Sequence, residues 1–138
     1  MKIGLVTITF NSANVLPDFL DSVAKQTYQN FFLYVIDNAS TDNTIEEYEY
    51  RKKENYQLIT NKNNLGVAAG NNQGIKKAIS EDCDFVLLIN NDTVFEERLL
   101  QKMIDAYHQY GSSIITPKML YHSPGNVIWY AGGFFDRK

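Results

Sequence analysis

Three polar residues, Asn90, Asn91 and Asp92, end an apolar run that begins at Phe85. The run is rich in Val, Leu and Ile and is too short for a typical helix, so it predicts a strand over residues 85–90 that is buried on both faces. In open α/β sheets, ligands bind outside the carboxyl ends of the strands. The three polar residues are therefore predicted to lie at a binding site. The alternative is a plain turn, because Asn and Asp are common turn residues.

Asp92 is the candidate metal ligand of this motif. A hard divalent cation that bridges two phosphates needs only one or two protein carboxylates, because the diphosphate supplies other ligands. Asp92 could fill that role with Asn90 or Asn91 beside it.

Polar residues also follow the other strands that the sequence predicts. They are Thr9, Asn11 and Ser12, then Asp37 to Ser40, and then Asn61 with Asn64 to Gly66. The carboxyl ends of parallel strands meet at one edge of a sheet, so four polar ends together predict a binding crevice. The carboxylate of Asp37 could hold a base edge or a ribose hydroxyl, or it could accept the amides of Ala39 and Ser40 in a local turn.

Three glycines, Gly66, Gly70 and Gly74, lie in a stretch that otherwise suits a helix. Each glycine in a helix interior costs about 1 kcal/mol relative to alanine. Small residues would let a ligand come close, and a helix that starts beside Gly66 would point free N–H groups at an anion. The alternative is tight packing of the helix on the sheet by Gly70 and Gly74.

Strand and helix patterns alternate along the chain and must position these residues. Strands are predicted over residues 2–9, 31–37, 56–60, 85–90 and 113–116. Helices are predicted over 16–24, from the N-cap candidates in 40–44 to about 54, over 67–81, and from 95 to near Gly111. The expected buried stripe of the third helix is Ala68, Ile75, Ala78 and Ile79. This order predicts an α/β fold, Rossmann-like, with a mostly parallel sheet flanked by helices on both faces.

Composition and missing motifs exclude several classes of protein. A net charge of −3 argues against a nucleic-acid binder, and no apolar stretch approaches the ~20 residues of a transmembrane segment. The chain has no G-x-G-x-x-G turn, no phosphate-binding G-x-x-x-x-G-K-[ST] loop and no G-x-S-x-G nucleophile elbow. We expect one domain over residues 1–138 and a cytoplasmic location.

The tail is aromatic, with Trp129, Tyr130, Phe134 and Phe135 around Gly132 and Gly133. A natural terminus is usually polar and frayed. We therefore expect the chain to be the front part of a longer protein.

Four segments together resemble the family-2 glycosyltransferases of the GT-A fold, particularly the rhamnosyltransferase-like branch. They are Val6–Asn11, Val35–Asn43, Asn63–Gly74 and Leu87–Asp92, in the family's order, and the segment from Gly132 to Asp136 is also similar to that branch. The resemblance implies an inverting transfer of a sugar from a UDP- or dTDP-linked donor to an acceptor hydroxyl. In the full protein the acceptor would be a saccharide or lipid-linked molecule, as in cell-surface polysaccharide synthesis, reached at the inner face of the membrane.

The resemblance also implies residue roles. Asp37 would contact the base, Thr9 and Asn11 would line the pocket for base and ribose, and the stretch from Asn64 to Gly74 would border the nucleotide and sugar. The predicted donor site comprises Thr9, Asn11, Asp37, Asn38, Asn64, Gly66, Gly70, Asn71, Asn90 and Asn91.

The segment from Asn90 to Asp92 stands at the family's D-x-D position. Asp92 would hold Mg²⁺ or Mn²⁺ on the diphosphate, although Asn90 replaces the first acid and leaves one carboxylate. The catalytic base of such enzymes would lie beyond Lys138, since Asp136 is interpreted as a turn residue. We therefore expect the chain to bind donor but to transfer little or no sugar.

Two other functions remain open from the residues alone. One is a sugar-nucleotidyltransferase, whose usual Gly-rich, basic first loop is missing here. The other is a non-catalytic nucleotide-binding α/β module.

Overall fold

The computed structural model describes residues 1–133, and the chain divides into two compact units, one ending at Glu97 and one beginning at Arg98. The elements of the first unit are β1 (Ile3–Thr9), α1 (Leu16–Ala24), β2 (Phe31–Asp37), α2 (Thr44–Arg51), β3 (Tyr56–Thr60), α3 (Gly66–Ser80) and β4 (Phe85–Leu88). The predicted helix over 16–24 and strand over 31–37 have the observed bounds, while α2 ends before residue 54.

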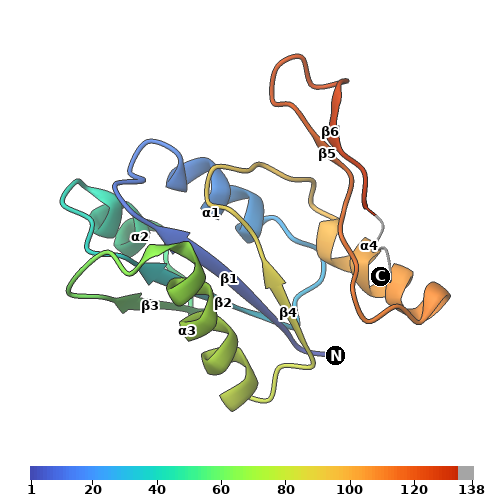
Figure 1. Cartoon of the computed structure of the whole chain (residues 1–138), viewed down its shortest axis with the longest axis horizontal. Coiled ribbons are helices and arrows are strands. Elements are labelled where there is room, and N and C mark those ends of the chain that lie inside the picture. Colours follow the sequence, from blue (N-terminus) through green and yellow to red (C-terminus); the bar gives the residue numbers. More distant parts are fainter. Residues whose placement is uncertain (134–138) are drawn as a thin grey trace, which may run out of the picture. The chain divides into compact units, whose positions relative to one another are not determined.

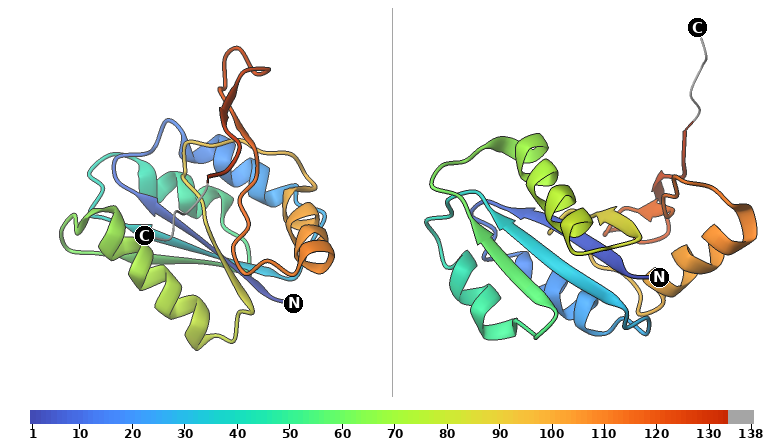
Figure 2. Two further views of the ribbon diagram at one scale, coloured as in Figure 1. Left: turned by 45° about the vertical axis from the view of Figure 1, so that its right-hand side comes forward. Right: turned by 90° about the horizontal axis from the view of Figure 1, so that it is seen from below.

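The first unit is a four-stranded sheet with the order β3-β2-β1-β4 (Figure 1). All three strand pairs are parallel. Helix α3 lies on one face of the sheet, and α1 and α2 lie on the other (Figure 2). The prediction of a mostly parallel α/β sheet covered on both faces is confirmed, and the carboxyl ends of the strands share one edge.

Helix α1 shows how apolar spacing builds this core. Leu16, Phe19, Leu20 and Val23 recur at helical spacing, and all four are buried. Pro17 lies in the first turn, where a missing N–H breaks no helical hydrogen bond.

Helix α3 corrects the predicted buried stripe. Its buried residues are Gly70, Gly74 and Ala78, whereas Ile79 is 63% exposed and Ala68 is exposed. A Cβ on Gly74 would stand 2.2 Å from Cγ1 of Val6, so the helix lies almost against the backbone of β1. At this distance only small residues fit, and the face of the helix is chosen by size rather than by hydrophobicity. The tight-packing alternative for Gly70 and Gly74 is therefore confirmed.

Strand β4 also differs from its prediction. It ends at Leu88, which is 47% exposed, and its other residues are half-buried rather than buried on both faces. The reason is its place: β4 is the last strand in the order and pairs only with β1 among the described residues.

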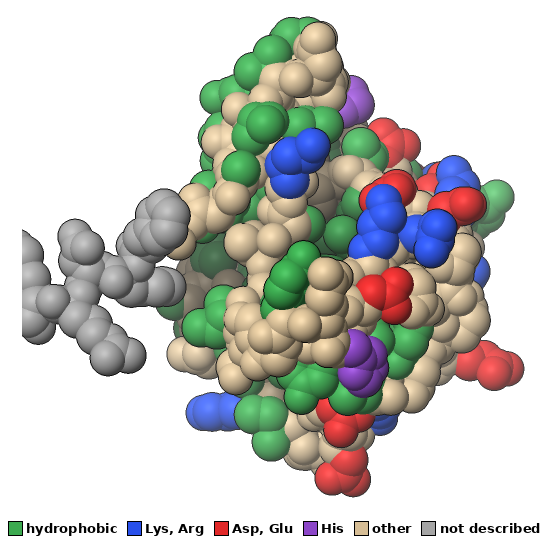
Figure 3. Space-filling model, turned by 90° about the vertical axis from the view of Figure 1, so that its right-hand side faces the viewer, with side chains coloured by type: hydrophobic (Ala, Val, Ile, Leu, Met, Phe, Trp, Pro, Cys, Tyr) green, Lys and Arg blue, Asp and Glu red, His purple; other side chains and the backbone are tan. Residues whose placement is uncertain are grey.

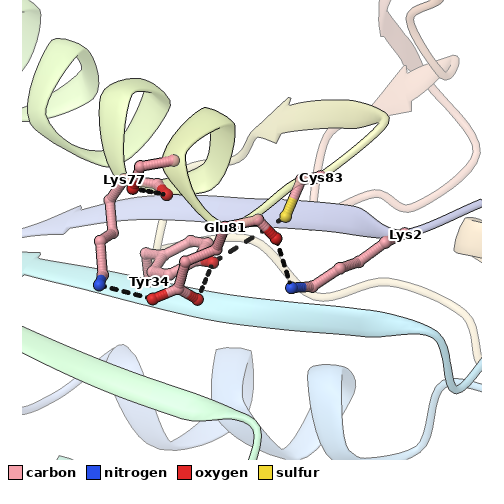
Figure 4. A network of polar contacts seen from close by, with 6 residues as sticks. Lys2, Tyr34, Lys77, Glu81 and Cys83 are labelled. Carbon is pink, nitrogen blue, oxygen red and sulfur yellow. Dashed lines mark hydrogen bonds and ion pairs between the residues drawn. The ribbon is translucent and has the colours of Figure 1, made fainter.

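A polar network closes the amino end of the sheet (Figure 4). The Tyr34 hydroxyl donates to Oε2 of Glu81 at 2.8 Å, Lys77 pairs with Oε1 of Glu81 at 2.5 Å, and the Lys2 ammonium donates to the Glu81 carbonyl at 2.7 Å. The hydrogen bonds from Lys77 and Tyr34 lower the pKa of Glu81. Burial, together with the bond to Glu81, raises the pKa of Tyr34. The network ties β1, β2 and the end of α3 together.

The second unit contains α4 (Leu99–Tyr110) and a hairpin of β5 (Met119–Leu120) and β6 (Ile128–Tyr130). Gly111 ends α4 in the left-handed conformation at φ 61°, as its position predicts. Hydrophobic side chains gather over the hairpin in Figure 3. The predicted strand over residues 113–116 is wrong: Ile114 is 78% exposed, and no strand of the described chain pairs with this segment.

Residues Phe134, Phe135 and Asp136 lie outside the described part of the chain. Within residues 1–133, no helix combines the length and the apolar character needed to span a membrane.

Candidate functional site

A cavity of about 460 Å³ opens at the carboxyl edge of the sheet, a size typical of small-molecule sites. Its lining residues are Ile8, Phe10, Ser12, Asn38, Asn64, Gly66, Val67, Asn71, Leu88, Ile89, Asn90, Asn91 and Asp92. All of them belong to the first unit. The polar strand ends thus converge on one cavity, as the sequence predicts.

Seven of the predicted site residues line this cavity, and four do not. Those that line it are Asn38, Asn64, Gly66, Asn71, Asn90, Asn91 and Asp92. The four others are Thr9, Asn11, Asp37 and Gly70. Gly70 instead packs on β1, since a Cβ there would stand 2.8 Å from Cδ1 of Ile8. The proposed ligand contacts of all eleven residues stay predictions.

Asp37 lies beneath the cavity at the end of β2 and is 1% exposed. Its Oδ1 accepts hydrogen bonds from the hydroxyls of Thr9, at 2.8 Å, and Ser40, and its Oδ2 accepts the Ser40 amide at 3.0 Å. The local-turn alternative is therefore realised for Ser40. The carboxylate joins the ends of β1 and β2 and places the loop that follows each.

Two neighbours fix the side-chain amide of the next residue, Asn38. Its Oδ1 accepts from Asn61 at 2.9 Å, and its Nδ2 donates to the carbonyl of Gly66 at 3.3 Å. Asn61 and Gln73 exchange two further hydrogen bonds, at 2.8 and 2.9 Å, as a reciprocal amide pair. Asn38 is 1% exposed, so its amide is oriented by β3 and α3 before any ligand arrives.

Helix α3 brings its first turn to the cavity. Gly66 begins the helix at φ 78°, a conformation that favours glycine, and its amide donates to Oδ1 of Asn64 at 2.9 Å. Gly66 and Val67 line the cavity. The following N–H groups of a first helical turn lack intrahelical acceptors and favour an anion.

The segment after β4 carries Asp92, the only acid among the described residues that line the cavity. Before it, Asn91 donates to the hydroxyl of Ser12 at 2.8 Å. After it, the segment that follows α1 fixes the chain, because Nε2 of Gln26 donates to the Glu96 carbonyl at 2.8 Å and the Thr27 amide donates to the Glu97 carbonyl at 2.8 Å. Asp92 itself has neither an ion pair nor a side-chain hydrogen bond within residues 1–133.

The donor set suits a hard divalent cation. Asp92 offers a carboxylate, and Asn90 and Asn91 offer amide oxygens, which are ligands that Mg²⁺ and Mn²⁺ accept. No group of three or more His, Cys, Asp or Glu side chains gathers within residues 1–133. The residues therefore fit a cation that receives most of its ligands from a bound diphosphate and water.

Sequence reasoning missed Phe10 as a site residue, and it named Ser12 only as one of the polar residues at the predicted crevice. Both line the cavity, and Phe10 is 49% exposed. The available signal was position, since Phe10 directly follows β1 at the carboxyl edge and a large apolar side chain is unusual at such an exposed strand end.

The family model described as Glycosyl transferase family 2 matches residues 5–135. The chain belongs to glycosyl transferase family 2. Its fold is accordingly the GT-A fold seen in its structural relatives, and the assignment decides against the sugar-nucleotidyltransferase alternative.

Two relatives illustrate the match in sequence. Glycosyltransferase GlyG of Streptococcus pneumoniae is 24% identical over 135 residues, which cover 95% of this chain and 44% of GlyG. TarS of Staphylococcus aureus, a poly(ribitol-phosphate) beta-N-acetylglucosaminyltransferase, is 31% identical over 125 residues, which cover 86% of this chain and 21% of TarS. The chain thus spans less than half the length of these relatives.

Solved structures of glycosyltransferases also match this chain. The crystal structure of S. aureus TarS 1–349 in complex with UDP-GlcNAc has a TM-score of 0.73 and 28% identity, and the match covers 81% of this chain and 32% of that one. The mannosyltransferase PcManGT of Pyrobaculum calidifontis, in complex with GDP-Man and Mn²⁺, has a TM-score of 0.61 at 22% identity and covers 68% of this chain and 28% of its own. The second likeness shows the fold alone.

Proposed function

We propose that the cavity is the donor site of an inverting glycosyltransferase and binds a UDP- or dTDP-linked sugar together with Mg²⁺ or Mn²⁺. The observation that carries the proposal is Asp92, an unpaired carboxylate in a cavity otherwise lined by amides, a hydroxyl and apolar side chains. The likeness to TarS, solved in complex with UDP-GlcNAc at 28% identity, supports this class of donor.

Charge explains why a cation is needed. No Lys or Arg within residues 1–133 lines the cavity, so the described side chains contribute only the negative charge of Asp92. A diphosphate would be repelled by that charge unless a divalent cation lay between them. When bound, Mg²⁺ or Mn²⁺ would stabilise the charge that develops on the leaving diphosphate.

The remaining contacts come from this chain. The first turn of α3, at Gly66 and Val67, offers N–H groups to phosphate oxygens. The exposed ring of Phe10 offers an apolar face to the base. Asn64 and Asn71 can donate to or accept from sugar hydroxyls.

Transfer also needs a base for the acceptor hydroxyl, which would attack the anomeric carbon opposite the leaving diphosphate and invert it. If Asp92 serves the cation, no second carboxylate among residues 1–133 lines the cavity for this task. We propose that the base and the acceptor site belong to other parts of a longer protein, with a saccharide or lipid-linked acceptor. The cytoplasmic location stays a prediction.

A thermal-unfolding panel tests the donor site. The chain is heated with UDP, dTDP or GDP, with Mn²⁺ or with EDTA. A ligand at 100 times its dissociation constant should add ~2.7 kcal/mol to the free energy of unfolding, and we expect this only for UDP or dTDP with Mn²⁺. A folded sample that no nucleotide stabilises would overturn the proposal.

A further inference from the structure

The hydroxyl of Ser12 has no hydrogen-bonding capacity left for a ligand. Its oxygen accepts from the Phe10 amide at 3.2 Å and from Nδ2 of Asn91 at 2.8 Å, and its proton is donated to the Phe10 carbonyl at 3.4 Å. A serine hydroxyl has one proton and two acceptor lone pairs, so all three are in use. Ser12 lines the cavity, but its hydroxyl makes all of its hydrogen bonds to other residues of the protein.

The backbone of Ser12 is fixed from the neighbouring loop. Its amide donates to Oγ1 of Thr44 at 2.7 Å, and that hydroxyl donates to Oδ1 of Asp42. The Ala13 amide donates to Oδ2 of Asp42 at 3.1 Å. Burial works against the charge of Asp42, but the hydrogen bonds from Thr44 and Ala13 outweigh it and lower the pKa. These hydrogen bonds therefore fix the position of Ser12 on the cavity wall.

The fixed hydroxyl of Ser12 determines which end of the Asn91 amide faces it. In the structure the proton of Ser12 is directed to Phe10, so Ser12 accepts from Asn91, and Asn91 presents its nitrogen to Ser12. The amide oxygen of Asn91 is then left over, and no hydrogen bond to it occurs within residues 1–133. Oxygen is the atom that a hard cation accepts, whereas an NH₂ group would repel it.

We propose that Ser12 is a positioning residue that turns the amide of Asn91 so that its oxygen stands available beside Asp92 as a second ligand for the divalent cation. The inference rests on the proposed donor site. It gives the motif two oxygen donors although Asn90 occupies the position of the first acid, and it assigns the second donor to Asn91 through a residue on another loop.

A double-mutant cycle tests this inference. UDP affinity is measured by calorimetry with Mn²⁺ and with EDTA for the wild-type chain, Ser12→Ala, Asn91→Ala and the double variant. The readout is the gain in affinity that Mn²⁺ provides. Partial unfolding would reduce both affinities alike, whereas loss of a cation ligand reduces only the gain. We expect Ser12→Ala to lower the gain about three- to tenfold and to have no further effect in the Asn91→Ala background.

Two further variants serve as controls for loss of folding and for the loss of a hydroxyl elsewhere in the protein. Ser12→Cys keeps most of the volume but accepts hydrogen bonds weakly, so it should lose part of the gain while remaining folded. Ser80→Ala removes an exposed hydroxyl that donates to the Lys77 carbonyl and should leave the gain unchanged.

A ligand-free measurement separates this inference from the proposed function. In ¹⁵N spectra, the side-chain NH₂ signals of Asn91, identified by their loss in Asn91→Ala, should exchange faster with water in Ser12→Ala. Suppose that Mn²⁺ raises the UDP affinity of the wild-type chain. The positioning role alone would then be overturned if Ser12→Ala kept this gain in affinity, or if Ser12→Ala reduced the gain equally in the Asn91→Ala background. No gain in wild type would overturn the proposed function and this inference with it.

Discussion

The two ends of the sheet differ in whether their carboxylates have partners. At the amino end, the carboxylate of Glu81 is paired with Lys77 and accepts the hydroxyl of Tyr34. At the carboxyl end, Asp92 has neither an ion pair nor a side-chain hydrogen bond within the described chain. A paired charge stabilises the fold and has little left for a ligand, while an unpaired charge contributes little to the fold and can bind a cation. This contrast predicts that Glu81 serves the fold and that Asp92 serves a ligand.

Helix α3 runs between the two ends of the sheet. A substitution that forces α3 away from β1 should therefore destabilise the fold. Gly74→Ala should lower the free energy of unfolding by about 2 kcal/mol or more, because overpacking against Val6 exceeds the gain in helix propensity of ~1 kcal/mol. Gly70→Ala should cost less, since it meets the flexible end of Ile8. Chemical denaturation measures both changes. Asn72→Ala, on the exposed side of α3, is the control and should be neutral or slightly stabilising.

Breaking the amide pair should affect the carboxyl end alone. Gln73→Met removes both hydrogen bonds to Asn61 and should lower the free energy of unfolding by about 1 kcal/mol. It should also weaken UDP binding, because Asn61 orients Asn38 on the cavity wall. Gln57→Met, at a half-buried glutamine of β3 whose side chain makes no hydrogen bond within residues 1–133, should change neither quantity. Unaltered UDP affinity in Gln73→Met would show that the pair serves stability only.

The smallest effect is expected at the amino end and depends on pH. The hydrogen bonds from Lys77 and Tyr34 lower the pKa of Glu81 from its ordinary value near 4.5. Its charged form therefore stabilises the fold above that value, and the contribution is lost as the pH falls through the lowered pKa of the folded state. Glu81→Gln should cost about 1 kcal/mol at pH 7.

Denaturation of wild type and Glu81→Gln between pH 7 and pH 3 measures this contribution. The difference between the two proteins should shrink as the pH drops below about 4. A difference that stays constant over this range would contradict the assigned role of the Glu81 carboxylate.

Sequence patterns predicted the parallel strands and α1 because their buried residues follow the periodicities of strand and helix. They predicted the convergence of Asn38, Asn64 and Asn90 to Asp92 on one edge, since parallel topology forces that convergence. The patterns misplaced the buried face of α3, because a close backbone approach selects glycine over isoleucine and periodicity measures only hydrophobicity.

Partner choice within the site was beyond the sequence. The contact of Asp37 with Ser40 is local and was one of the sequence alternatives. Nothing local shows that Asp37 would also accept from Thr9, or that Ser12 would meet Asn91, because these contacts join segments far apart in the chain. The predicted strand over residues 113–116 failed for a similar reason, since a strand requires a partner that its own composition does not reveal.

Exchanging the two carboxylates for amides tests the central claim most directly. UDP binding with Mn²⁺ is measured by calorimetry, and unfolding by denaturant, for Asp92→Asn and Glu81→Gln. We predict that Asp92→Asn abolishes the Mn²⁺-dependent part of binding with unchanged stability, while Glu81→Gln lowers stability and leaves binding intact. Mn²⁺-dependent UDP binding that survives in Asp92→Asn, or that is lost in a folded Glu81→Gln, would contradict the assignment of function to the carboxyl end.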